Sequence, residues 1–245
     1  VGDDVILKSF SGGTRRNVVP EQAEAILIFS NDERLQQGKA ILVQGSAGIT
    51  LEDVPGQNQL KVIAQGISAH GSTPEQGDNA ITKLAEALAP LQKNGGLWNG
   101  VRFIQECFGR ATDGRGLGIN CQDEVSGVLT INLGVVRMED NQIQMEADIR
   151  SPHCANLSDM KEKIGKKLAP YGLKILKSSS LTPHYLPEDD RLVRTLLQVY
   201  REETGDWARP VATGGRTYAV TLGNGVAFGP VFPGQPETAH QKNEY

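Results

Sequence analysis

The sequence predicts an α+β fold in which helices cover one face of an antiparallel sheet, followed by a shorter segment built on one helix. Residues 128–136 and 142–149 alternate apolar and polar side chains on either side of a turn. Such alternation is typical of half-buried antiparallel strands. After Asp78 the apolar side chains instead recur at helical spacing, at Ile81, Leu84, Ala85 and Leu88.

The first third of the chain is expected to form a strand, a helix and two further strands. Residues 6–10 are apolar in alternation and lead into a turn. Pro20 suits the first turn of a helix, because its missing N–H needs no partner there. We expect that helix to present Ala23, Ile26 and Leu27 on one face. Residues 39–44 and 60–66 are predicted to be short strands.

The second third adds another helix and a hairpin. Asp78 is the expected N-cap of the helix that follows it, and Asp140 and Asn141 supply a hairpin turn. Ser158 is expected to cap a helix that ends at Gly172. Residues 173–176 are predicted to be a last strand, whereas the glycine-rich stretch 97–124 gives no clear pattern.

A domain boundary is predicted where serine and proline accumulate, at residues 178–185. Residues 1–182 then form one domain, and residues 183–245 carry a helix at 189–204 and glycine-rich loops. About 60 residues are few for an independent core. We therefore expect the second segment to complete a domain whose other half is absent.

The composition limits the partners. The 245 residues carry 25 basic and 29 acidic side chains, a formal charge of -4, so neither nucleic acid nor a membrane is an expected partner. The 3 cysteines are widely spaced, which favours free thiols and a cytoplasmic location. The chain does not begin with Met, and we expect both ends to be cuts.

Two histidine-containing loops are the candidate functional segments. His70 follows a strand directly and lies among small residues, and His240 follows a loop rich in proline and glycine. Loops held by a rigid sheet commonly carry function. The 4 histidines form no local metal-binding motif, however, so the residues alone leave the chemistry open.

Five segments, in order along the chain, resemble the M20 metallopeptidase family. Residues 68–74 (Ser-Ala-His-Gly-Ser-Thr-Pro) resemble its lid-domain histidine segment, residues 146–152 its Asp-x-Arg strand end, and residues 238–245 its C-terminal metal-ligand segment. Residues 12–20 and 214–219 are similar to segments of the PepV-like bacterial dipeptidases.

The resemblance implies a lid of two ferredoxin-like sheet-and-helix units at 1–182, and the last piece of an α/β zinc-peptidase catalytic domain at 183–245. It implies that His240 binds one of two divalent metal ions, zinc or else manganese or cobalt, and that His70 stabilises the oxyanion of the transition state. The substrate, a dipeptide or short peptide with a free C-terminal carboxylate, would be bound by Asn17, Arg150, Gly214, Gly215 and Thr217.

The chain also departs from the family pattern. The family's His-x-Asp, bridging Asp, Glu-Glu base and second metal carboxylate all precede the lid, and this chain has none of them. We therefore expect the fragment alone to be inactive and to bind no metal tightly. His70 and Arg150 are 80 positions apart, which fits the enlarged lid of the PepV-like branch and predicts a monomeric parent enzyme.

Two alternatives remain open. An amidohydrolase of the same family would remove an acyl group from an amino acid, and a comparison of dipeptides with N-acetyl amino acids would distinguish it. A non-catalytic binding module would lack the metal half by design, and the reading frame upstream of Val1 would distinguish that case.

Overall fold

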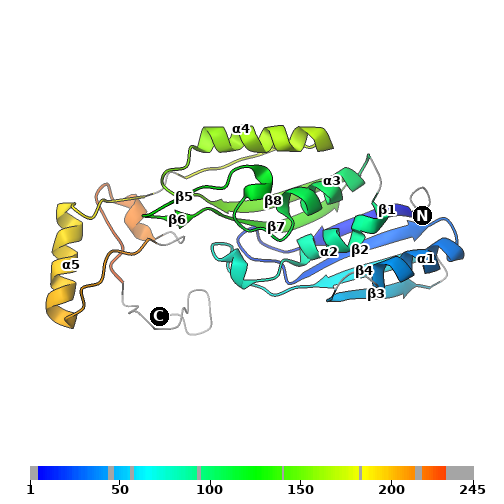
Figure 1. The fold of residues 1–245 in the computed structure, drawn as a ribbon, viewed down its shortest axis with the longest axis horizontal. Coiled ribbons are helices and arrows are strands. Elements are labelled where there is room, and N and C mark those ends of the chain that lie inside the picture. The colour runs from blue at the N-terminus through cyan, green and yellow to red at the C-terminus, as the bar shows by residue number, and fades with distance from the viewer. Residues whose placement is uncertain are drawn as a thin grey trace. The chain divides into compact units, whose positions relative to one another are not determined.

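A six-stranded antiparallel sheet is the centre of the first of two units, Val1–Pro183 and His184–Tyr245, in the computed structural model (Figure 1). The structure describes residues 5–43, 47–55, 58–92, 95–139, 141–181, 184–212 and 217–229. The strand order is β3-β4-β2-β1-β7-β8. The strands are β1 (Val5–Gly12), β2 (Gln22–Phe29), β3 (Ile49–Val54), β4 (Gln59–Gln65), β7 (Thr130–Glu139) and β8 (Gln142–Arg150). The mixed fold with an antiparallel sheet and helices is thus confirmed.

Alternating apolar residues explain the central strands. In β2 every second residue from Ala23 to Phe29 is buried, and the register places Ala25 and Leu27 beside buried residues of both β1 and β4. Leu27, for example, pairs with Leu7 on one side and Leu60 on the other. Side chains of a strand alternate between its faces, so one face of the sheet becomes continuously apolar.

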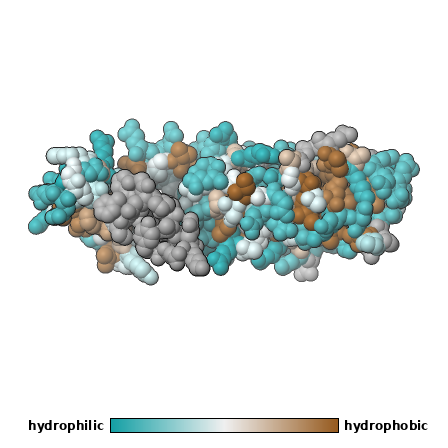
Figure 2. Space-filling model, turned by 90° about the horizontal axis from the view of Figure 1, so that it is seen from below, coloured by the Kyte–Doolittle hydropathy of each residue, from teal (hydrophilic) through white to brown (hydrophobic). Residues whose placement is uncertain are grey.

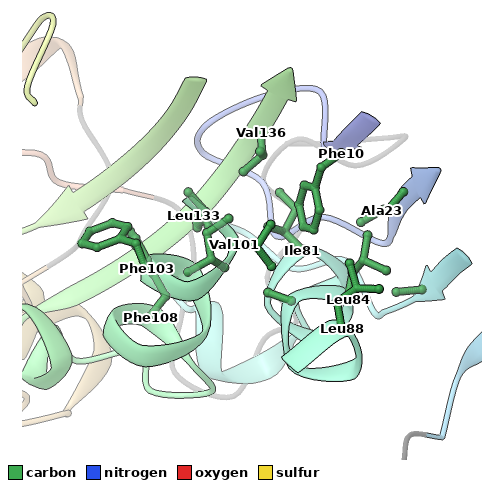
Figure 3. Close-up of a cluster of buried hydrophobic side chains, with 14 of the residues drawn as sticks. Phe10, Ala23, Ile81, Leu84, Leu88, Val101, Phe103, Phe108, Leu133 and Val136 are labelled. Atoms are coloured by element: carbon green, nitrogen blue, oxygen red, sulfur yellow. The ribbon is translucent and has the colours of Figure 1, made fainter. Parts of the chain in front are cut away.

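Helices cover this apolar face. They are α1 (Asp32–Val43), α2 (Ala80–Leu88) and α3 (Trp98–Phe103), the last continuing as the π-helical turn η4 (Ile104–Phe108). In Figure 3, Ile81, Leu84 and Leu88 of α2 lie beside Phe10 and Ala23 of the sheet. A Cβ added to Gly12 would come within 2.6 Å of Ile81, so the glycine lets α2 approach β1 closely.

The sheet has two parts that meet at one residue pair. Among the described residues, β1 and β7 pair through Gly12 and Val136 alone, and β7 then extends beyond the end of β1 toward Thr130. Strands β7 and β8 form the expected hairpin, with Glu139 opposite Gln142 and Asn141 in the left-handed conformation at φ 56. The two expected sheet-and-helix units are therefore joined into one sheet.

A further helix of the first unit packs against the same hydrophobic core, and several short elements accompany it. The helix α4 (Leu157–Leu168) buries Met160 and Leu168 and is followed by the short helix η6 (Ala169–Tyr171). The hairpin β5 (Gln122–Asp123) and β6 (Gly127–Val128) forms a separate two-stranded sheet. Short helices η2 (Pro74–Gln76), η3 (Ala89–Leu91) and η5 (Arg115–Leu117) complete the unit.

Three predictions of secondary structure were wrong. The helix expected after Pro20 is strand β2, because residues 23, 25, 27 and 29 follow the two-residue period of a strand. The strand expected at 39–44 is the end of α1, whose buried Leu35, Gly38 and Leu42 are spaced as on one helix face. Residues 173–176 form no strand in the described chain, although Leu173 and Ile175 pack against the core.

Two predicted helix caps were displaced by one or two residues. Asn79 rather than Asp78 caps α2, accepting hydrogen bonds from the N–H groups of Ile81 and Thr82. Asn156 rather than Ser158 caps α4 in the same way. Asp78 instead forms an ion pair of 2.5 Å with the largely buried Lys83.

The second unit contains α5 (Arg191–Thr204) and the short helix η7 (Tyr218–Thr221). Asp190 caps α5, and Gly205 ends it in the left-handed conformation. Among its described residues, only Val193 and Ala219 are buried hydrophobic residues, whereas Trp207, Val211 and Tyr218 are exposed. The described part of this unit thus has very little core of its own.

The second face of the sheet is partly open to solvent. Ile6 of β1 is 62% exposed there, next to the polar Lys8, which donates to Gln59. On the face shown in Figure 2, hydrophobic residues lie in small groups among hydrophilic ones. Hydrophobic side chains exposed in this scattered way are ordinary for a protein surface.

Candidate functional site

The loop that contains His70 lies beside the loop that contains Asn17. After β4 ends at Gln65, the chain turns back so that His70 forms an isolated antiparallel bridge with Val18. The N–H of Val19 donates to the carbonyl of Ala69 at 2.9 Å, and the N–H of Gly71 donates to the carbonyl of Asn17 at 2.8 Å. A Cβ on Gly71 would come within 2.9 Å of the Asn17 backbone, so only glycine fits this approach.

Hydrogen bonds to Ser72 fix the tautomer of the His70 imidazole. The backbone N–H of Ser72 donates to Nδ1 at 3.2 Å, and the Ser72 hydroxyl lies 2.6 Å from the same nitrogen. A backbone N–H can only donate, so Nδ1 must be the acceptor and the neutral ring carries its proton on Nε2. In this tautomer the Nε2–H group of His70 is a hydrogen-bond donor.

A pair of asparagines anchors the Asn17 loop to strand β7. The Asn132 side chain is only 2% exposed, and its amide nitrogen donates to the carbonyls of Arg16 and Val18, each at 2.9 Å. Its amide oxygen accepts from Asn79 at 3.2 Å, and Asn79 also donates to the carbonyl of Leu133 at 2.9 Å. Neither asparagine is among the site residues predicted from the sequence.

Arg150 lies at the end of β8, where an ion pair orients its guanidinium. Its Nε donates to Asp148 at 2.8 Å. The register places Asp148 opposite Asn132, and Arg150 opposite Thr130, so these four side chains share one face of the hairpin. The Thr130 hydroxyl is buried and has no hydrogen-bond partner among the described residues.

The segment after Arg150 is held by the carboxylate of Asp123. One oxygen accepts from the N–H of Ser126 at 2.6 Å and the other from the N–H of Cys154 at 3.1 Å. These hydrogen bonds, the one from Ser126 first, hold the pKa of Asp123 well below its usual range. The chain on both sides of Arg150 is thereby fixed.

The topology brings His70, Asn17 and Arg150 to the same end of the sheet. Strands β1, β4 and β8 run toward that end. Asn17 lies in the loop after β1, His70 lies in the loop after β4, and Arg150 is the last residue of β8. Thr217 belongs to the second unit, where its hydroxyl accepts from the N–H of Ala219 at 3.3 Å and caps η7. Gly214, Gly215 and His240 lie outside the described residues.

Among the described residues, no three His, Cys, Asp or Glu side chains are grouped so that they could hold a metal ion. The described residues also contain no helix with the length and apolar character needed to cross a bilayer. The donor set of a two-metal centre is thus not assembled by the described residues themselves.

Comparison with known proteins agrees with the resemblance seen in the sequence. Residues 54–168 match the model of the peptidase dimerisation domain of the M20 family. This range runs from the end of β3 to the end of α4 and includes His70, Asn132 and Arg150.

Bacterial proteins that carry the name dipeptidase are similar along nearly the whole chain. "Putative dipeptidase YtjP" of Bacillus subtilis is 36% identical over 246 residues, which cover 98% of this chain and 51% of that protein. "Putative dipeptidase SSP1012" of Staphylococcus saprophyticus is 31% identical over 243 residues, 98% of this chain and 51% of that protein. This chain therefore spans about half the length of these relatives.

Proposed function

Because this chain belongs to the M20 peptidase family, we propose that it provides the lid and the last part of the catalytic domain of a dipeptidase. The observation that carries the proposal is the junction of the two loops, in which the Val18–His70 bridge sets the Asn17 loop beside an imidazole whose Nδ1 accepts from Ser72. Arg150 lies at the same end of the sheet.

In this proposal His70 acts on the scissile carbonyl. A peptide carbonyl gains negative charge on its oxygen as the tetrahedral intermediate forms. A donor fixed in advance stabilises that charge without reorganising during the reaction. The hydrogen bonds to Ser72 keep the His70 ring in the tautomer that can donate.

Arg150 and Asn17 recognise the substrate. A guanidinium presents several donors in a planar fork that matches a carboxylate, so Arg150 would bind the free C-terminus of a dipeptide. Asp148 holds the Arg150 side chain by its Nε and so limits its rotation. Asn17, whose backbone is fixed on both sides, would contribute an amide to the substrate backbone.

The second unit would supply the remaining contacts. Gly214, Gly215 and Thr217 would bind the carboxylate end of the substrate, and His240 would be one ligand of a two-metal centre whose other ligands lie elsewhere in the whole enzyme. The exposed Trp207, Val211 and Tyr218 support a larger catalytic domain, because burial against further chain would give this unit a core. We place the whole enzyme in the cytoplasm as a monomer.

Dipeptide hydrolysis tests the proposal. Leu-Gly is offered with zinc or manganese to this chain and to a protein extended upstream to the full length of the relatives. We expect hydrolysis by the extended protein only. There His70→Ala should lower kcat about 100- to 1,000-fold, and His153→Ala, at an exposed position, should not.

The role of Arg150 is tested with a second substrate. Arg150→Ala should remove the preference for Leu-Gly over Leu-Gly amide, whereas Arg137→Ala, an exposed arginine of β7, should keep it. Hydrolysis of N-acetyl amino acids in place of dipeptides would assign the amidohydrolase reaction instead. If the extended protein hydrolyses neither class, the dipeptidase proposal is wrong.

A further inference from the structure

We infer that Asn132 is a positioning residue, which acts on catalysis through the Asn17 and His70 loops without contacting the substrate. This inference rests on the proposed function for its effect on activity, but its structural part stands without it. Asn132 is only 2% exposed, although it lies on the face of β7 opposite to its buried neighbours Ile131 and Leu133.

The hydrogen bonds of Asn132 are directed at the backbone on both sides of Asn17. Its Nδ2 donates to the carbonyls of Arg16 and Val18, whereas the intervening carbonyl of Asn17 accepts from Gly71. The Asn17 loop is thus held from one side by a side chain of β7 and from the other by the His70 loop. Because β1 ends at Gly12, this part of β7 pairs with β8 but not with β1, and the Asn132 amide connects it to the loop that follows β1.

Gly134 allows the Asn17 loop to approach the backbone of β7 closely. A Cβ at position 134 would lie 2.3 Å from the carbonyl oxygen of Arg16, so the loop rests directly on the backbone of β7. Asn79 then fixes the orientation of the Asn132 amide, since it donates to the Asn132 oxygen while its own oxygen caps α2. One continuous set of hydrogen bonds therefore connects α2, β7, the Asn17 loop and His70.

Hydrogen exchange on this chain tests the structural part. In Asn132→Ala the amides of Val19 and Gly71, which join the two loops, should exchange about tenfold faster or more. Amides of β2, such as that of Leu27, should be unchanged. Leu133→Ala is the matched control, because it removes a neighbouring buried side chain of β7 without removing a donor. Unchanged exchange at Val19 and Gly71, or an increase equal to that in β2, would overturn the inference.

A double-mutant cycle on the extended enzyme tests the effect on activity. Asn132→Ala should lower kcat about tenfold or more, and it should add little when Asn17 is already alanine, because both changes act on one loop. Independent, additive effects of the two substitutions would overturn the positioning role. If the extended protein has no dipeptidase activity, the proposed function fails, and the exchange experiment still decides whether Asn132 holds the loops.

Discussion

Replacement of Asn79 should destabilise the first unit more than replacement of Asn156, although both residues cap a helix with the same geometry. Each side-chain oxygen accepts from the second and third N–H groups of its helix. Loss of such a cap costs about 1 kcal/mol. Asn156 is exposed and serves only α4, whereas Asn79 also donates to Asn132 and to the carbonyl of Leu133.

The additional cost follows from the two acceptors left without a donor. A buried acceptor that loses its partner costs about 1 kcal/mol or somewhat more. We therefore expect about 1 kcal/mol for Asn156→Ala and about 3 kcal/mol for Asn79→Ala. The difference of about 2 kcal/mol is roughly a 30-fold change in the unfolding equilibrium constant. Asn79→Asp keeps the capping oxygen but loses both donors, and should fall between the two.

Urea unfolding followed by tryptophan fluorescence measures the difference. Trp98 is 5% exposed in the first unit, and Trp207 is 78% exposed in the second, so Trp207→Phe in every variant leaves a signal from the first unit. With a slope of about 2 kcal/mol/M, the midpoint of Asn79→Ala should lie about 1 M below that of Asn156→Ala. Equal midpoints would refute the reasoning that the second function of Asn79 stabilises the unit.

Three further outcomes are expected. Gly134→Ala should destabilise the first unit, because its Cβ would overlap the Arg16 backbone. Gly165→Ala inside α4, where nothing lies within 4 Å of the added Cβ, should stabilise the unit slightly. Thermal unfolding of both variants measures these effects, and equal effects would contradict the prediction. Desolvation by burial, followed by the hydrogen bond to Asp123, raises the pKa of the Cys154 thiol. Asp123→Asn should therefore lower that pKa and speed alkylation of Cys154 by iodoacetamide at pH 8. An unchanged alkylation rate would show that Asp123 does not raise the thiol pKa. In the extended enzyme, Ser72→Ala should lower kcat with little change in KM, because Nδ1 of His70 loses its contact with the Ser72 hydroxyl. The control is Ser158→Ala on the exposed start of α4, which should leave both kcat and KM unchanged.

Long, regular patterns predicted the fold where they were unambiguous. The β7–β8 hairpin and α2 were predicted because each shows a single period over many residues. Strand β2 was assigned wrongly because Ala23 and Leu27 fit both a helical face and a strand face. Helix α1 was missed because one of its buried positions is Gly38, where a Cβ would lie 2.4 Å from the ring of Phe29, and such a contact leaves no mark in hydropathy.

The candidate site was predictable only in part, and for a physical reason. Resemblance identified His70, Asn17 and Arg150, and the structure places them at one end of the sheet. Asn132 looked like a polar residue on the open face of an alternating strand. It is buried because a loop more than 110 positions earlier folds over it, as its hydrogen bonds to Arg16 and Val18 over 116 and 114 positions show. Local pattern cannot reveal a partner so distant in the sequence.

The single residue pair that joins β1 to β7 has a consequence for folding kinetics. The β7–β8 hairpin closes over a short turn, whereas Gly12 and Val136 must meet across 124 intervening steps of chain. Closing such a long loop costs conformational entropy before any stabilising contact forms, so non-local strand pairing is slow. The Asn17 loop can pack against β7 only after Gly12 and Val136 have paired. We therefore expect the candidate site to be among the last parts of the first unit to form, so that its assembly indicates that the whole unit has folded.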